Sequence, residues 1–233
     1  MPAAAVGITT TATTTIMTDP RHLTRLLAWM SPAFPTGGFA YSHGLEWAIE
    51  AGDITDAATL STWLHDVLRH GTGWSDAILL RHAHRSSANP LGLRDLADLA
   101  SAAAPARERR DEALNQGRAF VLAAEPWVGA ALPADAAYPV VVGALTGSQG
   151  VPEDDSVIAY LQVLTTNLIS AAVRLIPLGQ TDGLRVLAGL EPTILALMAD
   201  SRTAMLDDIG GCAFRSDIAA MRHETQYTRL FRS

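Results

Sequence analysis

Apolar residues recur at steps of three and four along most of the chain, which is the spacing of one face of an α-helix. The pattern is clear in residues 20–30, 55–71 and 157–176. Asp19 followed by Pro20 predicts the start of the first helix, because a carboxylate cap and a proline at the first helical position are typical of helix starts. The sequence therefore predicts an all-α fold, a single-domain bundle of roughly 8–10 helices.

Local signals place the ends of several of these helices. Capping side chains predict helix starts at Ser42, at Thr55 and at Ser75 or Asp76. Pro192 is expected to separate the last two apolar segments, because proline interrupts the hydrogen bonds inside a helix.

Two apolar segments are each compatible with two kinds of structure. Residues 139–145 contain three consecutive valines, which favour a strand, but a lone strand has no partner, so a short buried helix is expected. Residues 157–176 are apolar enough to cross a membrane. Asn167 and Arg174 would be costly in lipid, so this window is interpreted as the central helix of the bundle and no membrane is expected as a partner.

Composition narrows the function. The chain has 233 residues, is 48% hydrophobic and carries a formal charge of −7, which suits a globular protein and argues against nucleic acid as a partner. All 17 basic residues are arginine. Without lysine the chain has no phosphate-loop lysine, so any nucleotide chemistry is expected to belong to a partner.

The N-terminal residues and the cysteine content indicate where in the cell the protein works. Cys212 is the only cysteine, so neither an internal disulfide nor a CxxC site is possible, and a reducing compartment fits. Residues 1–19 are rich in Thr and Ala and lack the pattern of a signal peptide, so we expect a disordered leader and a cytoplasmic location.

The last part of the chain differs in amino-acid composition from the predicted core. Residues 207–212 have the composition of a hinge, and beyond them Arg215, Arg222 and Arg229 are seven residues apart. We therefore divide the chain into the leader 1–19, a helical core domain 20–206 and a flexible partner-binding tail 207–233. The alternative is a final helix that lies on its own core.

A loop rich in proline and glycine joins the first two predicted helices. Residues 31–46 read SPAFPTGGFAYSHGLE and place Phe34, Phe39, Tyr41 and His43 on a bend. Aromatic and polar side chains on such a loop are typical of a binding site, although buried aromatics are more often packing.

This loop and two later segments resemble one known family. Residues 167–183 read NLISAAVRLIPLGQTDG and residues 221–233 read MRHETQYTRLFRS. In this order, the three segments resemble the signatures of urease accessory protein F, the UreF family. The chain departs from the family pattern at His43, where glutamine is frequent, and in its longer Thr-rich leader.

The resemblance implies an all-α adaptor without catalysis that helps to deliver nickel to the urease apoenzyme. It implies a homodimer that assembles with urease accessory protein D/H and with the GTPase accessory protein G. Nickel would be handled by the complex and GTP would be bound by the partner, so the chain has no cofactor of its own. Tyr41, His43 and Glu46 would shape the face that receives the GTPase. The residues implied to dock on the D/H partner are Arg222, His223, Glu224, Tyr227, Arg229, Leu230, Phe231 and Arg232.

Other functions remain open at this stage. No metal site is expected, because a closed site needs about four converging ligands, and His43, His223 and Cys212 are only weak candidates for a transient nickel contact. One alternative is a small helical hydrolase or transferase that uses His223 with Glu224, or Glu46. Another is a helical regulatory module with an unrelated partner.

Overall fold

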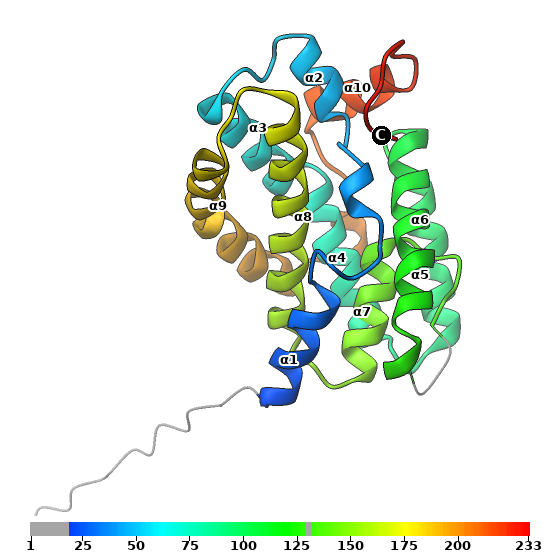
Figure 1. The fold of residues 1–233 in the computed structure, drawn as a ribbon. Helices are drawn as coiled ribbons and strands as arrows, with labels where there is room; N and C mark the ends of the chain where they lie inside the picture. Colours follow the sequence, from blue (N-terminus) through cyan, green and yellow to red (C-terminus); the bar gives the residue numbers. More distant parts are fainter. Residues whose placement is uncertain (1–18, 129–131) are drawn as a thin grey trace, which may run out of the picture.

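The computed structural model describes residues 19–128 and 132–233, and these residues form ten α-helices, four 3-10 turns and no strand (Figure 1). The all-α prediction is confirmed. Residues 1–18 of the expected leader lie outside the described residues. The helices are α1 (Pro20–Trp29), α2 (Leu45–Glu50), α3 (Ala57–His70), α4 (Thr72–Arg85), α5 (Pro90–Ala102), α6 (Arg107–Ala123), α7 (Tyr138–Ser148), α8 (Glu153–Leu175), α9 (Gln180–Asp200) and α10 (Phe214–His223).

The core is built around the close packing of α4 on α7. Every residue of α7 from 138 to 146 is buried, as expected for the valine-rich window. A Cβ atom on Gly143 would lie 2.2 Å from the carbonyl oxygen of Leu80, and one on Gly147 would lie 2.3 Å from that of His84. Glycine at both positions therefore lets the two backbones touch.

The long helix α8 runs through the middle of the bundle and packs on α9, α4, α2 and α7. Its length and composition alone would allow it to cross a membrane, and half of its most apolar window is buried against neighbouring helices. It ends at Leu175, two residues before Pro177, as the sequence predicts.

One buried arginine ties three helices together. Arg81 on α4 is 1% exposed and pairs with Glu153 and with Asp154 at the start of α8. It also donates to the carbonyl oxygen of Met198 in the last turn of α9 at 2.6 Å, and to the hydroxyl of Ser201, which follows α9, at 3.0 Å. The buried guanidinium thus has acceptors on every side, which a buried charge requires.

Helix α2 starts later than expected, although the Ser42 hydroxyl accepts a hydrogen bond from the backbone N–H of Glu46 in its first turn, at 3.3 Å. The helix begins at Leu45, and the preceding residue is Gly44 with a φ of +78°. A Cβ atom on Gly44 would lie 2.6 Å from the backbone nitrogen of Ala220 on α10. Gly44 is therefore required both by its left-handed conformation and by the contact with α10.

Three other expected boundaries are also corrected. The cap of α3 is Asp56 rather than Thr55, because Asp56 and Thr59 bond to each other's backbone N–H groups. Helix α4 begins at Thr72, not at Ser75 or Asp76, directly after the single linking residue Gly71. Helix α9 continues through Pro192, which lies on an exposed side where the lost hydrogen bond faces water.

The C-terminal segment also differs from the expected loose tail. Helix α10 packs on α2, and the following residues return to the loop before α2, with Phe231 and Ser233 buried. Figure 1 shows α10, α2 and the C-terminus together at one end of the bundle. Sequence composition could not reveal this packing, because it depends on carboxylates from distant helices.

Candidate functional site

The three sequence segments that carry the family resemblance meet at this end of the bundle. Arg174 on α8 donates to the carbonyl oxygen of Phe39 in the loop at 2.8 Å. The same guanidinium lies 4.4 Å from the centre of the Phe231 ring in the C-terminal segment. Asn167 packs beneath Gly38, where a Cβ atom would come within 2.7 Å of its side-chain nitrogen. One arginine thus joins all three segments.

Glu46 at the start of α2 holds the C-terminal segment by its backbone. Its Oε1 accepts a hydrogen bond from the N–H of Leu230 at 2.7 Å, and its Oε2 accepts one from the N–H of Phe231 at 3.0 Å. Oε2 also lies 3.1 Å from Nε2 of His223. A buried carboxylate with three donors is well satisfied, and the segment it binds is fixed in conformation.

His223 lies between two carboxylates and is 0% exposed. Its Nδ1 is 2.7 Å from Oε2 of Glu108 on α6, opposite the contact of Nε2 with Glu46. Both ring nitrogens are thus occupied by carboxylate oxygens, which fixes the ring between α2 and α6. The second oxygen of Glu108 accepts from Arg229 at 2.7 Å.

Glu112, one turn further along α6, extends the cluster inward. It pairs with Arg109 and accepts from the Ser233 hydroxyl at 2.6 Å and from Gln116 at 3.1 Å. Burial acts to raise the pKa of Glu112, but the Arg109 charge and the hydrogen bonds it accepts lower the pKa to about 2. The carboxylate is therefore ionised throughout the neutral range.

His43 is buried beside Glu112 with a φ of +62°. Its Nε2 lies 3.0 Å from the Thr72 hydroxyl, and its Nδ1 lies 3.7 Å from Oε1 of Glu112, too far for a hydrogen bond. Burial, together with the nearby Arg109 charge, lowers the pKa of His43 to about 4. His43 is therefore neutral at pH 7.

Every buried carboxylate of the cluster is paired. The carboxylates of Glu46, Glu108 and Glu112 face the His223 ring and the guanidinium groups of Arg109 and Arg229. This pairing makes burial of the carboxylates tolerable. The arrangement binds backbone and fixes a segment. It leaves neither nitrogen of the histidine ring open to a substrate.

The structure separates the pair that the hydrolase alternative uses. The half-buried Glu224 accepts from the backbone N–H of Arg107 at 3.0 Å, whereas His223 faces Glu46 and Glu108. Glu46 and His223 are in contact, but both are buried. Their side chains are engaged by one another and by the C-terminal segment.

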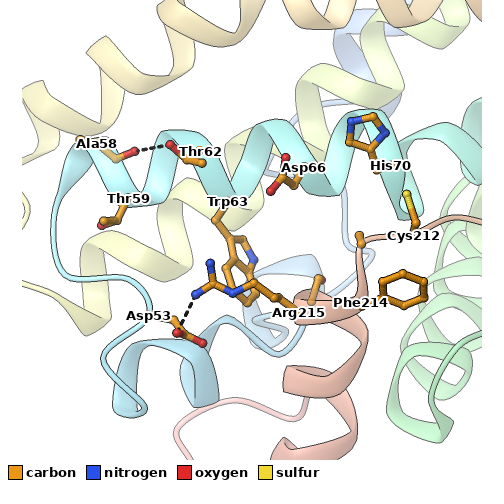
Figure 2. Close-up of a pocket in the computed structure, with 12 residues that line it drawn as sticks. Asp53, Ala58, Thr59, Thr62, Trp63, Asp66, His70, Cys212, Phe214 and Arg215 are labelled. Atoms are coloured by element: carbon orange, nitrogen blue, oxygen red, sulfur yellow. Dashed lines mark hydrogen bonds and ion pairs between the residues drawn. The ribbon is translucent and has the colours of Figure 1, made fainter.

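The three weak metal candidates do not meet. His43 and His223 belong to the buried cluster, whereas the exposed Cys212 lines a separate cavity of about 450 Å³ with His70. Figure 2 shows these two side chains at one end of the cavity and Arg215 against Trp63 in its middle. Within residues 19–128 and 132–233, no three His, Cys, Asp or Glu side chains are placed to hold a metal ion.

The predicted partner-binding residues divide by exposure. The buried ones are Tyr41, His43, Glu46, His223 and Phe231. The exposed ones are Arg222, Tyr227, Arg229, Leu230 and Arg232, with Glu224 half-buried. Of the buried group, Glu46, His223 and Phe231 connect the C-terminal segment to the core.

Sequence reasoning missed the residues of α6 and an apolar stripe on α10. Glu108, Arg109 and Glu112 are buried, although the charged run that contains them has the composition of a solvated helix. Phe214 and Ile218 on α10 are exposed, four residues apart on one face, and Met221 continues the stripe. The spacing of this stripe was a signal that the sequence offered.

Comparison with known proteins gives consistent matches. A sequence model described as UreF matches residues 54–191. The chain is 51% identical over 221 residues to the urease accessory protein UreF of Rhodopseudomonas palustris (strain TIE-1), covering 91% of this chain and 92% of the relative. It is 52% identical over 231 residues to that of Bradyrhizobium sp. (strain BTAi1 / ATCC BAA-1182), covering 93% and 95%. It is 49% identical over 214 residues to that of Mesorhizobium japonicum, covering 91% and 96%.

Proposed function

Because the chain belongs to the UreF family of urease accessory proteins, we propose that it is a non-catalytic adaptor in the maturation of the urease metallocentre. In this proposal it works in the cytoplasm as a homodimer and assembles with accessory protein D/H, the GTPase accessory protein G and the urease apoenzyme. Nickel is the cargo of the complex. GTP is bound by the partner.

The observation that supports this proposal most strongly is the way the C-terminal segment is presented. On the core side, Glu46 accepts hydrogen bonds from the backbone N–H groups of Leu230 and Phe231, while the side chains of Tyr227 and Leu230 are exposed to solvent. Because the backbone of this segment is already fixed, it loses little conformational entropy when a partner binds its exposed side chains. This is the structure expected of a docking surface.

The apolar stripe of α10 extends the same surface. Phe214, Ile218 and Met221 are each at least half exposed, while Ala219 and Ala220 on the opposite face are buried. Aromatic and methionine side chains are enriched in protein interfaces. We assign the D/H partner to the surface formed by Phe214, Ile218, Met221, Tyr227 and Leu230.

The division of labour with the GTPase follows from the chemistry present. The chain lacks lysine, and the histidine of its buried cluster has both nitrogens engaged. An adaptor of this kind couples GTP hydrolysis to nickel delivery by binding one state of the GTPase more tightly than the other.

The test is copurification of the purified chain with the D/H partner. We expect the double variant Tyr227→Asp with Leu230→Asp to lose binding, because two exposed apolar contacts become charged. Leu91→Asp is the matched control: Leu91 is a similarly exposed leucine on the distant helix α5, so this variant keeps binding.

Two results would overturn the proposal. If the double variant still binds the D/H partner, the assignment of the binding surface to Tyr227 and Leu230 is wrong. Hydrolysis of GTP by the purified chain alone would contradict the division of labour between adaptor and GTPase.

A further inference from the structure

The cavity that contains Trp63 and Arg215 lies between α3 and the start of α10 (Figure 2). Its volume of about 450 Å³ falls within the range of cavities that bind small organic molecules, roughly 300–1,000 Å³. None of its lining residues belongs to the buried cluster of carboxylates around His223. It is therefore a separate candidate for a binding site.

Helix α10 begins in this cavity without a cap. Its N-cap residue is Ala213, whose side chain has no acceptor. Among the described residues, the backbone N–H groups of Phe214, Arg215 and Ser216 find no acceptor, and all three residues line the cavity. Free N–H groups at a helix start form the positive end of the helix dipole and favour an anion.

The start of α10 is already held in position. The N–H groups of Cys212 and Ala213 both donate to the carbonyl oxygen of His70 at the end of α3, at 2.8 and 3.0 Å. The free N–H groups that follow are therefore fixed relative to α3, and a ligand can bind them without ordering the chain first.

Trp63 provides an independent sign of a missing ligand. The residue is only 6% exposed and lines the cavity, and Figure 2 shows its ring extending from α3 into it. Among the described residues its Nε1–H donates to no acceptor, whereas the Nε1–H of Trp74 donates to the carbonyl oxygen of Asp208 at 2.8 Å. A largely buried indole N–H usually has a hydrogen-bond partner, so this donor points to an acceptor bound in the cavity.

The guanidinium of Arg215 adds a positive charge. It lies 5.6 Å from the centre of the Trp63 ring, and its Nη2 donates to Oδ1 of Asp53 at 2.6 Å. A guanidinium has five N–H donors, so others remain for a ligand. The second carboxylate of the cavity, Asp66, has a side chain that is 57% exposed, and water weakens its repulsion of an anion.

We infer that this cavity binds a small organic carboxylate. The carboxylate supplies the missing cap of α10 and accepts from the indole N–H of Trp63 and from Arg215, while the apolar body of the ligand lies against Trp63 and the exposed ring of Phe214. The inference goes beyond the adaptor role and does not depend on it.

The test uses sodium benzoate as the probe, because it joins a carboxylate to an aromatic body. Benzamide is the matched control, since it has the same shape and no charge. We expect titration calorimetry to give a dissociation constant of ~1 mM or tighter for benzoate and at least about tenfold weaker binding of benzamide. In ¹⁵N NMR spectra, benzoate shifts the indole N–H signal that disappears in Trp63→Phe.

Three variants separate the contributions of the cavity. Trp63→Phe keeps an aromatic ring but loses the N–H, and Arg215→Gln loses the charge; each weakens benzoate binding by about fivefold or more. Asp66→Asn removes a repulsive charge and tightens binding by about twofold. Arg118→Gln changes an exposed arginine on α6 outside the cavity and leaves binding unchanged. Arg215 and Asp66 are exposed, so their variants keep the core intact.

Two results would overturn the inference: an indole signal of Trp63 that does not move with benzoate, or equal binding of benzoate and benzamide. Excess benzoate in the copurification with the D/H partner then identifies the source of the carboxylate. Release of the partner assigns it to an acidic side chain of that protein, and retention assigns it to a free organic acid; either result keeps the site.

This experiment fails separately from the test of the adaptor function. That test changes Tyr227 and Leu230, and neither residue lines the cavity. A chain that binds the D/H partner but not benzoate contradicts the carboxylate site alone. A chain that binds benzoate but no partner contradicts the adaptor proposal alone.

Discussion

Glu46→Gln tests whether the buried cluster holds the C-terminal segment. In the native chain Oε2 of Glu46 accepts from the N–H of Phe231 and from His223, and Oε1 accepts from Leu230. A glutamine side chain keeps one acceptor oxygen and replaces the other with a donor. If the amide NH2 takes the Oε1 position, the Leu230 N–H loses its acceptor; if it takes the Oε2 position, the Phe231 N–H and the His223 ring lose theirs.

The expected loss follows from these contacts. A buried N–H left without an acceptor costs about 1–3 kcal/mol. We expect Glu46→Gln to lower the free energy of unfolding by about 1–3 kcal/mol, which moves the urea midpoint down by roughly 0.5–1 M.

Glu50→Gln is the matched control. Glu50 lies one turn along the same helix and accepts a hydrogen bond from Gln226 at 2.6 Å, but it is exposed. Its substitution is expected to stay within about 0.5 kcal/mol. Urea unfolding of both variants at one fixed protein concentration, with hydrogen exchange of the Leu230 and Phe231 amides, makes the comparison. Equal effects of the two substitutions would refute the claim that Glu46 anchors the segment.

Four further predictions concern the same structure. Removing residues 224–233 leaves buried carboxylates without their donors, so the thermal midpoint falls by roughly 10 °C; an unchanged midpoint in calorimetry would contradict the packing described. Since the folded pKa of His43 is lowered from 6.5 to about 4, the unfolded chain binds the proton first as pH falls. Between pH 7 and pH 5 the native chain therefore loses roughly 2 kcal/mol more free energy of unfolding than the His43→Gln variant. Urea unfolding of both proteins at both pH values measures this, and an equal loss in the two proteins would refute it. Gly44→Ala places a methyl group against the α10 backbone in a left-handed conformation and destabilises by about 2–4 kcal/mol in urea unfolding; tolerance would show that the contact is loose. Arg81→Ala lowers stability by about 3–5 kcal/mol, whereas Arg85→Ala, which changes a partly exposed arginine, costs far less; similar losses would contradict the role of burial.

The sequence predicted the helices well because their signals are local. Apolar spacing and capping residues located most of them, and the valine-rich window 139–145 was correctly expected to be a buried helix because an isolated strand has no partner. The prediction of a helix break at Pro192 was wrong, because α9 continues through this residue. A proline on the exposed side of a helix removes only one hydrogen bond, which water can replace.

The candidate site was less predictable because it is assembled from distant segments. Glu46, Glu108 and His223 are far apart in sequence and meet only in the folded chain. The charged run around Glu108 has the composition of a solvated surface, and its burial becomes favourable only because Arg109 and Arg229 compensate the charge. The three segments that resemble the family signatures contact one another in the fold, and only the structure shows this.

The most direct test of the adaptor role is nickel incorporation into purified urease apoenzyme. The reaction contains nickel, GTP, the D/H partner and the GTPase, with or without this chain, and the nickel bound to urease is measured after removal of free metal. The account predicts that nickel loading rises well above the background only when the chain is present. Equal loading with and without the chain would contradict it.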